Sequence, residues 1–434
     1  MVLTIDEGPI TLFEPHPAES QPTRRSFFPP SAQCRRSAPQ PEYDFMPTVF
    51  RSDVRHFLAL CRRAGVRKLR RAASPAIAVL GDTDGMRLRL LTRDLAIEYS
   101  VSHSTSDIAL RLPLEALDAC AGRRGEPVTF DVAVDGRVEL RWTDRGVPRR
   151  GEFSQPPAVD ESFPAPPTNF VAHDAELWKA LGDAVACTDE ESKRYALGCV
   201  RLCGATGRIE ATDGRQALVQ TGFQFPWEEN LLIPGSKLLG CPEIERGAIE
   251  IGRTDDWVSV RTGKWLIQLR IQNEARFPNI EQVIPNPELA RSRLELSPSD
   301  AEFLKTTLPH LPCHDDIYRP ITCDLNGRVL IRSRELSAAH PVEVDLRSST
   351  LEGAPIQVST DRRYVDRALR LGFRKILFHD PNSPALAVDQ RRRYLWAVLD
   401  KTSAIARHEQ AQKIDSPLVS SKITKPRRAM RLAA

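Results

Sequence analysis

The 434-residue sequence has few aromatic residues, a small net charge and no long apolar run. Aromatic residues make up 6% of the chain, and no stretch approaches the ~20 consecutive apolar residues of a membrane-spanning helix. The N-terminus lacks the basic segment followed by an apolar one that marks an exported protein. We therefore expect a cytoplasmic protein with no membrane partner.

Familiar site motifs are also missing. The nine cysteines form no CxxC pair and most lie in apolar stretches, which is typical of reduced, buried thiols rather than a disulfide framework. No GxxxxGK[ST] or GxGxxG loop is present to hold phosphates. These absences predict a protein without a cofactor and without catalytic residues.

One short cluster could be interpreted as a set of metal ligands. It comprises His310, Cys313, His314 and Asp315, just after Pro309. The spacing matches no familiar zinc pattern, and no second ligand pair lies nearby in the sequence. We favour an ordinary loop here and predict no metal. A hydrolase that uses this loop remains an alternative.

The charge is small but unevenly placed. The net charge is +4, and residues 402–434 hold seven Lys and Arg against two acids, a balance of +5 that leaves −1 for the rest of the chain. A body so close to neutral excludes wholesale coating of phosphates, so any contact with DNA must be local and weak.

Both ends of the chain differ in composition from the middle. Residues 1–46 are proline-rich without apolar periodicity, and residues 403–434 form a basic tail. We predict that both are disordered. Between them, a pattern of roughly 120 residues occurs three times. We predict three domains, at 47–167, 168–287 and 288–402.

Each copy of the repeat has the same order of elements. An amphipathic helix comes first, predicted at 54–61, 177–185 and 303–308. Two strands follow, joined by a glycine turn: Asp84-Gly85, Thr206-Gly207 or Asn326-Gly327. A second helix is predicted at 114–120, 236–239 and 361–371, and more strands close each copy. This pattern predicts an α+β protein with helices on one face of antiparallel sheets.

Four motifs then point to a family. Glu210-Ala211-Thr212-Asp213-Gly214-Arg215-Gln216-Ala217 and the upstream Arg194-Tyr195-Ala196-Leu197 resemble the middle domain of the bacterial DNA polymerase III beta subunit, the sliding clamp. The segment 276–285 is similar to its second linker. Asp380-Pro381-Asn382-Ser383-Pro384 and the strand 394–399 resemble its C-terminal region. The motifs occur in the family's order, and the resemblance runs over about residues 50 to 402.

The resemblance implies a non-enzymatic processivity factor in DNA replication. Its three tandem clamp domains would form half of a ring, and a head-to-tail homodimer would encircle double-stranded DNA without reading its sequence, with twelve helices lining the hole. DNA polymerase and clamp loader subunits would bind through short linear motifs. The candidate DNA contacts are Arg55, Arg62, Arg67, Lys68, Arg70, Arg71, Arg363, Arg367, Arg370 and Arg374.

The resemblance also implies a peptide cleft between the second and third domains. Its residues would be Arg194, Leu197, Thr212, Gly214, Arg215, Ala217, Pro278, Val283, Asn382, Pro384, Ala397 and Leu399. This cleft departs from the family pattern. His-Arg-Leu is replaced by Arg215-Gln216-Ala217, an arginine of the linker by Gln282, and the usual C-terminal end by a longer tail. We therefore expect an altered cleft and a divergent or paralogous clamp.

One further alternative follows from these departures. A chain with the clamp fold could bind and regulate replication factors without encircling DNA. The two interpretations differ in what they require of the ends of the chain, because only a ring needs two complementary ends.

Overall fold

The computed structural model describes residues 47–65, 75–101, 107–157, 162–192, 196–244 and 247–418. The first repeat comprises β1 (Thr48–Phe50), α1 (Arg51–Arg63), β2 (Ile77–Asp82), β3 (Gly85–Leu91), β4 (Leu95–Val101), β5 (Ile108–Leu112), α2 (Leu114–Cys120), β6 (Pro127–Val132), β7 (Val138–Asp144) and β8 (Val147–Phe153). Both predicted helices of this repeat are confirmed.

The second repeat has the same order of strands but one α-helix in place of two. It comprises β9 (Phe170–His173), α3 (Ala175–Val185), β10 (Cys199–Cys203), β11 (Arg208–Thr212), β12 (Gln216–Gln220), β13 (Asn230–Pro234), β14 (Ile249–Arg253), β15 (Trp257–Thr262) and β16 (Trp265–Arg270). A linker with two 3₁₀ turns, η2 (Ile280–Val283) and η3 (Pro287–Leu289), leads to the third repeat.

The third repeat again has two α-helices. It comprises β17 (Ser292–Glu295), α4 (Pro298–Thr307), η4 (Leu308–His310), β18 (Pro320–Leu325), β19 (Val329–Ser333), β20 (Val342–Asp345), β21 (Thr350–Gly353), β22 (Ile356–Asp361), α5 (Arg362–Arg370), β23 (Lys375–Phe378), β24 (Ala385–Val388) and β25 (Arg392–Trp396). After it come η5 (Lys401–Ser403) and β26 (Gln412–Asp415).

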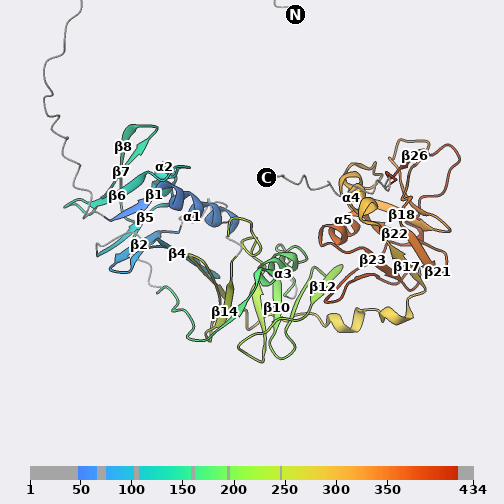
Figure 1. Ribbon diagram of the computed structural model, residues 1–434, viewed down its shortest axis with the longest axis horizontal. Helices are drawn as coiled ribbons and strands as arrows, with labels where there is room; N and C mark the ends of the chain where they lie inside the picture. The colour runs from blue at the N-terminus through green and yellow to red at the C-terminus, as the bar shows by residue number, and fades with distance from the viewer. Residues whose placement is uncertain are drawn as a thin grey trace, which may run out of the picture. The chain divides into compact units, whose positions relative to one another are not determined.

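The strands form four sheets, two of which combine consecutive repeats (Figure 1). One sheet has the order β5-β2-β3-β4-β16-β15-β14-β9 and joins repeats one and two. Another, β13-β10-β11-β12-β25-β24-β23-β17-β21, joins repeats two and three. The remaining sheets are β1-β6-β7-β8 and β22-β18-β19-β20-β26. All pairs are antiparallel except β20 with β26.

The two faces of the sheet that joins repeats two and three pack against different partners. Side chains alternate along a strand, so neighbours in sequence face opposite ways. Leu218, Tyr394 and Trp396 lie in the core that includes the residues of α3 and α5. Ala217 and Leu395 lie in a second, smaller cluster with Phe277, Ile280 and Ile284 of the linker. The helices therefore cover one face and the linker crosses the other.

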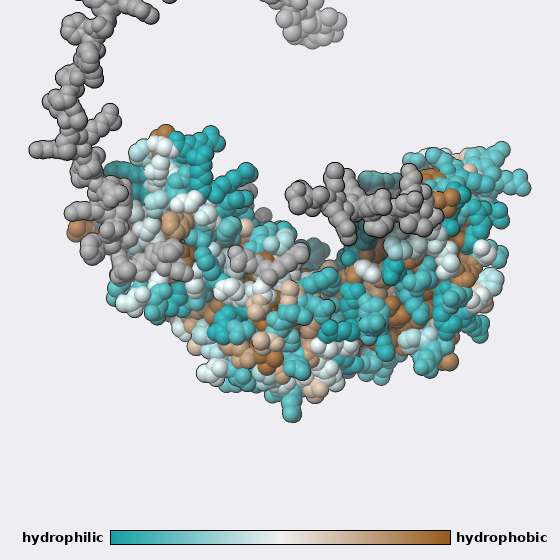
Figure 2. All heavy atoms as spheres, in the orientation of Figure 1, coloured by the Kyte–Doolittle hydropathy of each residue, from teal (hydrophilic) through white to brown (hydrophobic). Residues whose placement is uncertain are grey.

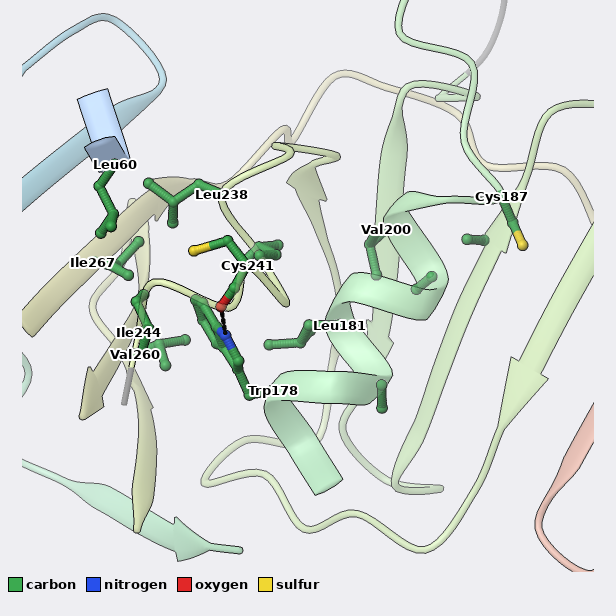
Figure 3. Packing of buried hydrophobic residues seen from close by; sticks show 14 of the residues in the cluster. Leu60, Trp178, Leu181, Cys187, Val200, Leu238, Cys241, Ile244, Val260 and Ile267 are labelled. Atoms are coloured by element: carbon green, nitrogen blue, oxygen red, sulfur yellow. Dashed lines mark hydrogen bonds between the residues drawn. The ribbon is translucent and has the colours of Figure 1, made fainter. Parts of the chain in front are cut away.

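The predicted helix at 236–239 is wrong, because this segment forms a turn. It lies between Gly235 and Gly240, and a single helical turn is too short to be stable by itself. Gly240 has φ +72°, and a Cβ there would lie 2.4 Å from the Cα of Gly182 in α3. Leu238 and Cys241 nevertheless fill the core near Leu60 of α1, and the indole of Trp178 donates to the Cys241 carbonyl at 3.1 Å (Figure 3). The turn thus fills the space predicted for a helix.

The prediction that the chain is disordered from residue 403 onward is wrong for residues 403–418. Ile405 is buried, and its N–H donates to the Thr322 hydroxyl at 2.8 Å. Further on, β26 adds a parallel strand to the edge of β20. Disorder was predicted from the basic composition of this segment, which gives little weight to its few apolar residues. The remainder, 419–434, and the predicted extension 1–46 lie outside the described residues.

Candidate functional site

The arginines of α5 share a helix but not an environment. The apolar stripe Val365, Ala368 and Leu369 is buried, as predicted. Arg363 donates through Nε to the Asp361 carboxylate at 2.9 Å, and Arg370 donates to Asp366 at 2.7 Å. These hydrogen bonds to carboxylates raise the pKa of each guanidinium above its usual value. Both positive charges are therefore already balanced on their own helix.

Arg367 lies near Cys187 of the second repeat. It is half-buried, and its charge lowers the pKa of Cys187, against the larger effect of burial, which raises that pKa to about 12. Arg374 follows the helix, is exposed and makes no ion pair with any described carboxylate. Of the four arginines predicted on this stripe, Arg374 is thus the one exposed cation without a partner in the described part of the chain.

The other helices show the same balance of charge. On α1, Arg62 pairs with Asp118 of α2 at 2.9 Å, whereas Arg55 is exposed and has no ion pair among the described residues. Lys179 pairs with Asp183 on α3, and Lys305 pairs with Glu302 on α4. Arg67, Lys68, Arg70 and Arg71 of the predicted loop cluster lie outside the described residues.

The predicted cleft residues gather on the face of the sheet that the linker crosses. Cross-strand register places Thr212 beside Ala217, and Ala217 beside Leu395. One step along, the Ala397 N–H donates to the Arg215 carbonyl at 2.8 Å. Ala217 is covered by the linker cluster, whereas Arg215 and Ala397 are exposed. Arg215 and Ala397 thus extend the sheet beyond the region that the linker covers, and this exposed extension is here called the open strip.

Two contacts join the linker to strands β10 and β11 of this sheet. Glu210 is fully buried on β11, where it accepts from Arg201 at 2.7 Å and pairs with Arg208 at 3.0 Å. Arg201 lies over the Phe277 ring at 4.7 Å, and Arg208 also pairs with Glu281. These contacts fix the linker to the sheet. They were not predicted, although the alternation of Arg and Glu along β10 and β11 was a signal.

The rim residues have mixed environments. Val283 is 53% exposed on η2, and Pro278 and Leu197 are partly buried. Leu197 lies next to Gly214, since a Cβ on that glycine would be 3.6 Å from it. Arg215 stacks on the Tyr318 ring at 5.4 Å, a contact that was not predicted. Arg194 lies outside the described residues.

The last cleft residues line a separate hollow in the third repeat. The Leu399 N–H donates to the Ser359 carbonyl of β22 at 2.8 Å, which draws the chain away from the strip. Leu399 lines a hollow of about 360 Å³ with Asp380 and Pro381, next to Asn382. Pro384 lies immediately before β24. The structure therefore divides the predicted cleft into an open strip and a neighbouring hollow.

The residues considered for metal or thiol chemistry are not arranged for it. In the described part of the chain, no three His, Cys, Asp or Glu residues are grouped as metal ligands. The Cys313 thiol donates to the Asp315 carbonyl at 2.9 Å. All eight described cysteines are free, and burial raises the pKa of Cys61, Cys120 and Cys323 to about 12, which keeps those thiols protonated. No helix in the described residues is long and apolar enough to cross a membrane.

Comparison with known proteins gives a likeness in structure without one in sequence. No protein-family model matches the chain, and no curated protein does. Among solved structures, a DNA polymerase sliding clamp from Pseudomonas aeruginosa aligns with a TM-score of 0.66 and 18% identity, over 81% of this chain and 99% of that one. The DNA polymerase III subunit beta from Borrelia burgdorferi aligns with a TM-score of 0.68 and 11% identity, over 82% and 100%. This chain has the fold of a bacterial sliding clamp.

A third neighbour shows how far sequence and fold diverge. The DNA polymerase III beta subunit from Thermotoga maritima aligns with a TM-score of 0.65 and 13% identity, over 81% of this chain and 98% of that one. Nearly the whole length of each clamp structure is thus matched, and the fold is shared from first repeat to last.

On the face drawn in Figure 2, the described apolar residues are scattered in small groups among hydrophilic ones.

Proposed function

We propose that this chain is a DNA sliding clamp, a non-enzymatic ring that encircles duplex DNA in the cytosol and tethers replication proteins to it. The observation that supports this most is the junction between repeats. Strand β4 of the first repeat pairs with β16, the last strand of the second, and β12 of the second pairs with β25, the last strand of the third. The same rule, applied once more between two chains, would close a homodimeric ring.

The DNA contacts of such a ring would be sparse. Arg55 and Arg374 are exposed cations of the described residues without ion pairs, and the predicted loop cluster at 67–71 would supply more. Long cationic side chains contact phosphates without fixing a register, which permits sliding. Paired cations such as Arg62 and Arg370 would contribute less, because a carboxylate already neutralises each of them.

The open strip and the neighbouring hollow would bind short peptide motifs of a polymerase and a clamp loader. An extended peptide can lie along the exposed residues Arg215 and Ala397 and place an apolar anchor at the rim. Ala217 leaves less apolar surface than a larger side chain would. Arg215 is engaged with Tyr318. We therefore expect a preference for motifs that differ from those of ordinary clamps.

Threading onto DNA tests the proposal directly. A linear duplex with biotin at both ends would be blocked by streptavidin either before or after the protein is added. Protein that encircles DNA is retained in about 0.5 M salt, where phosphate contacts are screened, only when the ends are blocked afterwards. The full chain and a chain that ends at Arg407 would be compared, because β26 covers an edge that the ring requires. Equal retention in both orders of addition would contradict encirclement.

A second function is favoured by one specific observation. Because β26 pairs with β20, the outer edge of β20 is not free for a partner in the described structure. A clamp-fold protein that binds replication factors without encircling DNA would show no dependence on the order of addition with either form of the chain.

A further inference from the structure

The first two repeats follow one rule of strand pairing. In each, three strands run in sequence, and the third pairs with the last strand of the following repeat. Strand β4 meets β16 in five antiparallel pairs, from Leu95 with Leu269 to Tyr99 with Trp265. Strand β12 meets β25 in five pairs, from Gln216 with Trp396 to Gln220 with Arg392. The corresponding strand of the third repeat is β20, which has no following repeat within its chain.

The matching unpaired strand is β8, the last strand of the first repeat. It lies at the end of the sheet β1-β6-β7-β8, so its outer edge bonds no described strand. Its side chains are largely exposed, and Val147 is 50% exposed. An edge strand with unpaired backbone groups is a ready site for another strand. By the pairing rule, β8 and β20 are the two ends that would meet between two copies.

The outer edge of β20 is instead occupied by the chain's own C-terminal segment. Strand β26 pairs with it in four parallel pairs, from Val342 with Gln412 to Asp345 with Asp415. Beyond the strand, the Ser416 N–H donates to the Asp345 carbonyl at 2.9 Å, and the Ser416 hydroxyl accepts from the Arg347 N–H at 2.9 Å. Ahead of it, the His408 ring packs on His340 with centroids 4.3 Å apart.

We propose that residues 408–416, here called the cap, are an intramolecular block on ring closure, and that the β8 strand of a second copy replaces them when the ring forms. This inference rests on the proposed ring, whose closure it makes conditional. The cap holds β20 in the orientation opposite to the other junctions, parallel rather than antiparallel, and in four pairs rather than five. With fewer backbone pairs than the other junctions, the cap can be displaced by a strand that pairs in the antiparallel orientation.

The charges on the strands favour a second copy as the alternative occupant. Strand β20 carries Glu343 and Asp345, and β8 carries Arg149 and Arg150. Glu343 is only 6% exposed, and its Oε2 atom has no hydrogen-bond partner among the described residues. Lys413 of the cap lies opposite it in register but makes no ion pair with it in the described structure. The Arg149 guanidinium of β8, which makes no ion pair in the described part of the chain, would satisfy this buried carboxylate better than the cap does.

Solution mass tests the cap with two variants. A chain that ends at Arg407 keeps the buried Ile405 and uncovers β20. Ile414→Pro keeps every residue but removes a backbone donor in the middle of β26. Leu418→Ala, at an exposed position beyond β26, is the matched control. We expect the full chain and the control to be monomers at micromolar concentration. We expect both variants to dimerise with at least a tenfold lower dissociation constant.

Two outcomes would overturn the cap. One is a full chain that is already dimeric under the same conditions, or whose dimer is weakened by either variant. The other is that both variants keep the far-ultraviolet spectrum of the full chain yet remain monomers. Charge reversal then identifies the partner strand. In the shortened chain, Arg149→Glu with Arg150→Glu should abolish the dimer, and adding Glu343→Lys should restore it. Unchanged dimerisation with the reversed β8 would exclude that strand.

The failure of the cap and the failure of the clamp function can be distinguished. If the shortened chain dimerises but is not retained on end-blocked DNA, the cap stands and encirclement fails. If the full chain is retained on DNA as efficiently as the shortened one, encirclement stands and the cap fails.

Discussion

At the scale of residues, several of the cations on the helices of this clamp fold already have a carboxylate partner. Arg62, Arg363 and Arg370 each bind a neighbouring carboxylate. A cation that already has a partner must give it up to bind phosphate, so its net gain from DNA is small. Grip on DNA would then depend on the few unpaired cations, which agrees with the near-neutral body of the chain.

The salt dependence of DNA binding separates paired from unpaired cations. Arg55→Ala and Arg374→Ala should each reduce the slope of log affinity against log salt by about 1, the value for one lost phosphate contact. Arg370→Ala, beside Asp366, is the matched control and should change the slope by less than half of that. Binding to short duplexes by fluorescence anisotropy over a range of salt measures all three. Equal slopes for the three variants would refute the distinction.

The sequence predicted the positions of these residues better than their partners. The stripe on α5 followed from helical spacing, because Val365, Ala368 and Leu369 recur at intervals that place them on one face. The capping of Asp361 onto the Arg363 N–H, and the ion pair that comes with it, depends on where the preceding strand ends. The proximity of Arg367 to Cys187 joins residues 180 positions apart in the chain, and no local pattern indicates it.

At the scale of elements, two short segments replace what the repeat pattern predicts. The turn at 236–240 stands where the other repeats have a second helix. It preserves the core through Leu238 and Leu239, which are buried. Its close approach to α3 requires glycines on both sides, Gly182 and Gly240. A pattern of apolar residues indicates burial, but it does not distinguish a four-residue helix from a turn.

Replacement of Gly240 by alanine should destabilise the protein strongly. The positive φ costs about 1 kcal/mol for a side chain, and the approach to Gly182 adds a clash with backbone that cannot move cheaply. We expect a total loss of about 2–4 kcal/mol. Gly327→Ala is the control, since Gly327 also has positive φ (+77°) but has open space around it, and it should cost about 1 kcal/mol. Urea denaturation measures both, and equal losses would show that the contact with α3 is unimportant.

At the scale of the whole molecule, the order of repeats is what connects the sequence to the fold. The threefold repeat and a few short motifs between residues 194 and 399 were enough to predict three clamp domains, although the sliding clamp from Pseudomonas aeruginosa is only 18% identical to this chain. The cap could not be predicted in this way. Its anchors, Ile414 and Ser416, are too few to form a pattern, and β26 is stable only because β20 lies beside it. These residues can be recognised as a strand only once β20, which the repeat pattern leaves unpaired, is seen beside them.

Closing the ring covalently around DNA tests the central claim most directly. Chains that end at Arg407 and carry Arg150→Cys and Glu343→Cys would be mixed as monomers with circular or linear plasmid, then linked with a short bis-maleimide. Chains that carry only one of the two substitutions control for linking through the native cysteines. We predict that the linked protein stays on the circular plasmid in dodecyl sulfate, is released when the plasmid is cut, and is absent from linear DNA. Efficient linking with no such retention on the circle would contradict the account.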